Sequence, residues 1–134
     1  MAQRRKNIEN IETAPKLAST VFNVGDWVEW AGAGEIQPLA PTSPVAGLCL
    51  EPIAATDADY ASIRQIHIDL AIESNDRFSM VVTTGSATAS MIGLPFDVDA
   101  ADSAGLDVSA PGTQFTITQV LSATLVEVKV SLFA

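Results

Sequence analysis

The sequence holds one histidine and one cysteine, residue types that often serve as catalytic bases, nucleophiles and zinc ligands. His67 precedes Asp69 by two residues, so both side chains are expected on one face of a strand, where they can share a hydrogen bond. Cys49 lies in an apolar stretch, which predicts a buried, unreactive thiol. We therefore expect the protein not to be an enzyme and to use no cofactor or metal.

Four aspartates, Asp97, Asp99, Asp102 and Asp107, follow one another closely. Hard cations prefer clustered oxygen ligands, so a weak calcium site over Asp97–Asp107 is one interpretation. The stretch lacks the central glycine and the final glutamate of a helix–loop–helix calcium site, which favours solvated loop carboxylates instead. A concealed enzymatic pair, Asp97 and Asp99, is a further alternative, although no base or nucleophile accompanies it.

The two tryptophans, Trp27 and Trp30, are candidates for binding another protein. They lie three residues apart in an expected strand and therefore face opposite sides of it. One interpretation places one tryptophan in the core and the other at an interface, where this residue type is enriched. The other interpretation places both at the rim of a single core.

The net charge of −9 is unevenly distributed along the chain. Residues 1–16 contain four basic and two acidic side chains, whereas the rest of the chain contains three basic residues and fourteen carboxylates. An acidic body repels phosphate backbones, and no apolar run reaches the ~18 residues that suggest a membrane span. We therefore expect neither a nucleic acid nor a membrane as a partner.

We interpret residues 1–19 as a basic N-terminal arm and residues 20–134 as the folded domain. Pro15 and the scarcity of large apolar side chains prevent the arm from forming a core of its own. The arm is expected to lie extended and to become ordered when it binds a neighbouring subunit. Its candidate partner-binding residues are Arg4, Arg5, Lys6, Ile8 and Ile11.

The clearest strand covers residues 65–73, where isoleucine and leucine alternate strictly with polar or small residues. Residues 77–83 follow a turn at 74–76, so these two strands are expected to pair as a hairpin. A single helical turn is expected at 87–93. Other short strands are expected at 27–30, 35–40, 45–51, 95–99, 106–108, 114–121 and 125–132.

About nine short strands without a long helix predict an all-β fold. We expect a single small β-barrel or jelly-roll-like sandwich of short antiparallel strands, preceded by the extended N-terminal arm. A chain of 134 residues lies in the size range of one domain, so one core is expected.

Several short motifs follow one another over roughly residues 20–120. They are Gly25-Asp26-Trp27-Val28, Gly34-Glu35-Ile36, Val45 to Glu51, Ile66 to Ile72, Gly85-Ser86-Ala87-Thr88-Ala89, and Phe115 to Ile117. In this order of motifs the chain resembles the decoration, or cement, proteins of tailed-bacteriophage capsids. The long basic arm is a departure, because many short members of that family lack one.

The resemblance implies a β-barrel or jelly-roll-like domain that binds the outer surface of the assembled head. Such a domain bridges neighbouring major capsid protein subunits and stabilises the shell, usually as a homotrimer at local three-fold positions. It also implies a location on the capsid exterior of the virion, after synthesis in the host cytoplasm. The alternative function is a receptor- or glycan-binding β module on a virion or cell surface.

Overall fold

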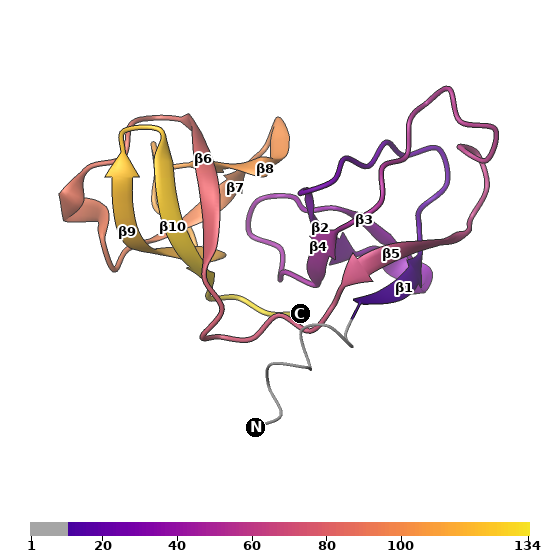
Figure 1. Ribbon diagram of the computed structural model, residues 1–134, viewed down its shortest axis with the longest axis horizontal. Coiled ribbons are helices and arrows are strands. Elements are labelled where there is room, and N and C mark those ends of the chain that lie inside the picture. The colour runs from indigo at the N-terminus through magenta and orange to yellow at the C-terminus, as the bar shows by residue number, and fades with distance from the viewer. Residues whose placement is uncertain (1–10) are drawn as a thin grey trace. The chain divides into compact units, whose positions relative to one another are not determined.

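The computed structural model describes residues 11–134, which form ten short strands and two single-turn 3-10 helices (Figure 1). This confirms the predicted all-β fold. The chain divides into two compact units. Unit 1 comprises Ala46–Ile72 and the described residues up to Pro38, and unit 2 comprises Leu39–Val45 and Glu73–Ala134. The expected single core is thus divided in two, because consecutive strands at the boundary join different sheets.

Unit 1 is a five-stranded antiparallel sheet in the order β1-β5-β4-β2-β3. Its strands are β1 (Ile11–Pro15), β2 (Trp27–Trp30), β3 (Ile36–Pro38), β4 (Gly47–Cys49) and β5 (Gln65–Asp69). An isolated bridge between Lys16 and Ile36 connects the end of β1 to β3, the strand at the opposite edge. The sheet is therefore curled until its two edges meet at this bridge, which covers backbone groups of both edges.

The core of unit 1 is built from alternate residues of its strands. Ile66 and Ile68 of β5 are fully buried, as their alternation predicted. Gly47 allows β4 to approach β5, because a Cβ at this position would lie 2.5 Å from the Asp69 carbonyl oxygen. Cys49 is buried, as expected, and burial raises the pKa of its thiol. The other buried members of this core are Ala14, Phe22, Val28, Ile36 and Ile53.

Lys16 is the buried polar anchor of unit 1. Its side chain is 0% exposed, and its Nζ donates hydrogen bonds to Tyr60 O at 2.9 Å and to Ser62 O at 2.6 Å. Tyr60 also contacts Ser19, because its Oη donates to Ser19 O at 2.9 Å and its carbonyl accepts from Ser19 N at 2.8 Å. A buried ammonium group requires such partners. These bonds fasten the segment after β1 to the loop between β4 and β5.

Unit 2 is a closed five-stranded barrel in the order β10-β6-β8-β7-β9 (Figure 1). Its strands are β6 (Phe78–Thr84), β7 (Pro95–Asp99), β8 (Asp102–Asp107), β9 (Phe115–Ser122) and β10 (Leu125–Val130). Neighbouring strands are antiparallel except β6 and β8, which are parallel and so differ from the expected antiparallel arrangement. Closure leaves the barrel without a free edge.

Gln114, directly before β9, is the buried polar anchor of unit 2. Its side chain is 0% exposed, and its Nε2 donates to Ala40 O and Ser43 O, both at 2.7 Å. Its Oε1 accepts a hydrogen bond from Val98 N at 2.8 Å. A single amide therefore fastens residues 39–45 to strand β7 of the barrel.

The predicted hairpin of residues 65–73 and 77–83 is wrong. Strand β5 pairs with β1 and β4, whereas β6 pairs with β10 and β8. The expected turn does form between them, since Glu73 N donates to Asp76 Oδ2 at 2.9 Å and Asp76 N donates to Glu73 O at 3.0 Å. A turn sequence determines the local backbone conformation, but it does not determine which strands pair.

The structure also differs from the prediction in the second half of the expected arm, residues 1–19. Residues Ile11–Pro15 form β1, which pairs along its whole length with β5. Ala14 and Lys16 are buried. These residues have a weak local strand propensity, so the sequence did not predict a strand here. They form one because the edge of β5 supplies their hydrogen-bonding partners. The first half, residues 1–10, lies outside the described part of the chain.

Replacing Lys16 with methionine is expected to destabilise unit 1 by about 1–3 kcal/mol, because the partly buried hydrogen bonds to Tyr60 O and Ser62 O are lost. Both tryptophans lie in unit 1, so urea unfolding followed by tryptophan fluorescence reports this unit. The control Glu12→Met changes an exposed residue of β1 and should shift the free energy of unfolding by less than about 0.5 kcal/mol. A Lys16→Met protein as stable as its parent would contradict this account.

Replacing Gln114 with leucine is expected to destabilise unit 2 by about 3 kcal/mol, because the buried Val98 N–H loses its acceptor and two partly buried carbonyl groups, of Ala40 and Ser43, lose the hydrogen bonds from Gln114. Hydrogen exchange of peptides from β7 and β9, measured by mass spectrometry, reports this loss. Gln119→Leu is the matched control, because Gln119 is exposed on β9. Equal hydrogen-exchange protection of these peptides in Gln114→Leu and Gln119→Leu would contradict the role of Gln114 as an anchor.

Candidate interaction surfaces

The residues predicted to bind a partner fall into three groups. Four of them lie outside the described residues, namely Arg4, Arg5, Lys6 and Ile8. Ile11 begins strand β1, and its backbone is in register with Asp69 of β5. It therefore belongs to the sheet of unit 1. Trp27 and Trp30 both lie on β2.

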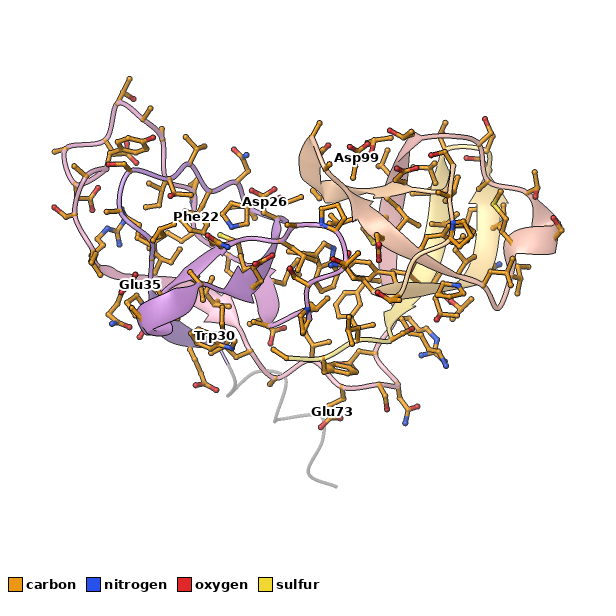
Figure 2. All side chains as sticks on the ribbon, turned by 180° about the vertical axis from the view of Figure 1, so that it is seen from behind. Phe22, Asp26, Trp30, Glu35, Glu73 and Asp99 are labelled. Atoms are coloured by element: carbon orange, nitrogen blue, oxygen red, sulfur yellow. The ribbon has the colours of Figure 1, made fainter. Side chains whose placement is uncertain are left out.

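The two tryptophans have very different exposures. Trp27 is 2% exposed and lies opposite Leu48 of β4, whereas Trp30, labelled in Figure 2, is 44% exposed. Three positions along a strand place side chains on opposite faces, which accounts for the difference. Of the two arrangements that the sequence allowed, the structure has one tryptophan in the core and the other at the surface.

Trp30 is held on a short, hydrogen-bonded hairpin. It is in register with Ile36 of β3, and Ala31 N donates to Glu35 O at 2.6 Å. The connecting turn, η1 (Gly32–Gly34), ends on a glycine with a φ of 85°, a conformation that favours glycine. Because the backbone is already ordered, covering the indole with a partner requires little further loss of entropy.

His67 belongs to an ionic network at the surface of unit 1. Glu51 Oε2 accepts from Arg64 Nη2 at 2.7 Å, and Glu51 Oε1 lies 2.9 Å from His67 Nδ1. Arg64 also forms an ion pair with Asp59. The imidazole thus bonds to Glu51 instead of the expected Asp69, whose Oδ1 accepts a backbone N–H two residues further on. With 60% of its side chain exposed, His67 makes a hydrogen-bonding contact with Glu51 at the surface.

The aspartates of residues 97–107 accept hydrogen bonds from nearby residues of unit 2. Asp97 Oδ1 accepts from Thr113 N at 2.8 Å, and Asp99 Oδ2 accepts from the hydroxyl groups of Thr83 and Thr84 at 2.7 and 2.6 Å. The Thr84 hydroxyl makes the largest contribution to lowering the pKa of Asp99. Within residues 11–134 no three histidine, cysteine or carboxylate side chains are grouped to hold a metal ion.

Unit 2 contains an apolar pocket of about 220 Å³ that the sequence did not predict. It is lined by residues 94–96, where β7 begins, and 108–111, which follow the end of β8. Phe96 and Val108 are almost buried, at 5% and 4% exposed, and Leu94 is 48% exposed. The pocket forms where the ends of two strands meet, so no local sequence motif predicts it.

Large apolar side chains are exposed on both units. In unit 1 they are Val21, Val24, Trp30 and Ile63, and in unit 2 they are Val81, Ile92, Leu94, Leu121 and Phe133. Single exposed residues of this kind are ordinary on protein surfaces. Val81 is also in register with Leu125 of β10, so the two make a small apolar surface on the barrel wall.

Comparisons of the chain with protein-family models, with curated proteins and with solved structures found no match. The helices of residues 11–134 are single turns, and none is long and apolar enough to cross a membrane.

The stability of unit 1 is expected to fall as the pH is lowered through the pKa of Glu51. Burial raises this pKa, but hydrogen bonds from Arg64 and His67 outweigh it and hold the pKa below its ordinary value of 4.5. A folded-state pKa below the unfolded one adds stability at higher pH, and that stability is lost as the carboxylate becomes protonated.

Urea unfolding, followed by tryptophan fluorescence from about pH 6 to about pH 3, measures this effect. Glu51→Gln should flatten the fall in stability at acid pH, whereas the exposed control Glu12→Gln should leave it unchanged. An acid sensitivity equal in the parent and in Glu51→Gln would show that this network does not contribute.

Proposed function

We propose that the protein is a decoration, or cement, protein of a tailed-bacteriophage capsid. It binds the outer surface of the assembled head and bridges neighbouring major capsid protein subunits, which stabilises the shell. The observation that carries this proposal is Trp30, 44% exposed on a hydrogen-bonded strand. Tryptophan is strongly over-represented among the residues that dominate the affinity of protein interfaces. The order of motifs along residues 20–120 supports the same role.

The composition of the chain also suits a surface that packs against other proteins. Only 17% of the residues are charged, and charged residues are depleted at the centres of interfaces. Val24 and Ile63, exposed by 60% and 59%, add apolar area to unit 1. The closed barrel and the curled sheet offer few free strand edges, so contacts with a partner would be made mainly by side chains.

The proposed form on the capsid exterior of the virion is a homotrimer at local three-fold positions. Three contacts made together raise the overall affinity by a factor of ~10²–10⁴ without improving any one of them. The chain is made in the host cytoplasm and joins the head after the shell has assembled. The proposed role requires no catalysis, which agrees with a surface contact between His67 and Glu51 and with a buried Cys49.

Trp30→Ala is expected to weaken binding to empty heads ~30-fold or more, because losing a dominant interface residue costs about 2 kcal/mol or more. Co-sedimentation of the purified protein with empty heads of the same phage measures the affinity. Val24→Ala, which trims another exposed side chain of unit 1, is expected to reduce binding by less than about threefold.

Both variants should unfold with the free energy of the parent to within about 0.5 kcal/mol, since surface substitutions seldom change stability. Absence of sedimentation by the parent protein would refute the proposed function. Equal binding by Trp30→Ala and its parent would remove the observation on which the proposal depends.

Trp30 also favours the second candidate, a receptor- or glycan-binding module, because sugar rings can stack on an exposed indole. A glycan array probed with labelled protein distinguishes the two functions. We expect no specific signal. A sugar bound by the parent and lost in Trp30→Ala would favour the second candidate.

A further inference from the structure

The apolar pocket of unit 2 lies beside two carboxylates. Strand β7 begins at Pro95 and β8 ends at Asp107, so the pocket residues 94–96 and 108–111 lie at one end of this strand pair. The last pair in register at that end is Asp97 opposite Asp107. A ligand for this surface therefore needs an apolar group close to positive charge.

The two carboxylates are only partly engaged. Oδ1 of Asp97 accepts from Thr113 N at 2.8 Å, Gln114 N at 3.2 Å and Thr113 Oγ1 at 3.4 Å, and Oδ1 of Asp107 accepts from Ser109 N at 2.8 Å and Ser109 Oγ at 2.5 Å. For both residues these bonds use only one of the two carboxylate oxygens. Among residues 11–134 no lysine or arginine side chain forms an ion pair with either carboxylate. Like charges directly opposite on neighbouring strands repel each other, so a cation placed between them would relieve this repulsion.

The ten residues before β1 have the complementary chemistry. They include three consecutive basic residues, Arg4, Arg5 and Lys6, and Ile8 is their single branched aliphatic residue. A dry cavity of ~150 Å³ admits a molecule as large as benzene, so the pocket has room for an isoleucine side chain. Both the charge and the apolar group that the surface needs are therefore found within five residues of the same chain.

We propose that residues 4–8 of a second copy of this chain dock on this surface, with Ile8 in the pocket and the basic side chains against Asp97 and Asp107. Ile11 is held in unit 1 by its pairing with β5, whereas the pocket belongs to unit 2. Docking of this segment on a second copy does not depend on how the two units of one chain are arranged. It joins two different surfaces head to tail, and such contacts form rings, trimers among them, when the rotation between copies closes.

Disulfide trapping between two variants of the full chain tests this docking. One variant carries Ile8→Cys and the other carries Ala110→Cys, an exposed position in the pocket wall. The native Cys49 is fully buried and contributes little background. Docking raises the local concentration of the two thiols, so the mixed, oxidised dimer should exceed that of a control pair at least ~10-fold. The control pair replaces Ala110→Cys with Ser79→Cys, exposed on β6 of the same barrel.

Three outcomes would overturn the proposal. The first is an equal yield of mixed dimer from the test pair and the control pair. The second is an unchanged yield when Arg4, Arg5 and Lys6 of the first variant are all replaced by glutamate. The third is closure of the disulfide within one chain in the Ile8→Cys/Ala110→Cys double variant at low protein concentration. No capsid is present in these experiments, so their failure is separate from a failure of capsid binding.

Discussion

Each unit depends on one fully buried polar side chain that hydrogen-bonds to the backbone of a loop. Leaving such a group without a partner costs about 1–3 kcal/mol, so the loop and the strands are held together. In unit 1, Lys16 bridges to Ile36, and Ile36 is in register with Trp30. In unit 2, Gln114 holds Val98 of β7, the strand that forms one side of the apolar pocket. Each anchor therefore stiffens the surface proposed to bind a partner.

The sequence predicted those features that depend on local pattern. Alternation identified β5, and a spacing of three in a strand placed Trp27 and Trp30 on opposite faces. Features that depend on distant pairing were not accessible. Residues 11–15 have little strand propensity and are ordered by the edge of β5. From the sequence, Gln114 could be recognised only as the start of a strand, because its hydrogen-bonding partners lie more than 15 residues away.

The sequence did not predict the division into two units, because it also depends on pairing between distant strands. The turn at residues 73–76 forms as its sequence predicts, yet it links two sheets. The result suits a binding protein, because each unit presents a side-chain surface on a backbone that is already ordered. Ordered surfaces lose less entropy on binding, which favours affinity from small contact areas. The low share of charged residues in the chain, 17%, supports the same conclusion.

Hydroxyl-radical footprinting of the protein, free and bound to empty heads, tests the central claim most directly. Oxidation of Trp30 should fall several-fold when heads are present, because its exposed indole would be covered in the proposed interface. Trp27 is buried in the free protein and should be oxidised slowly in both samples. Oxidation of Trp30 at the same rate in the free and the head-bound protein would contradict the proposed role.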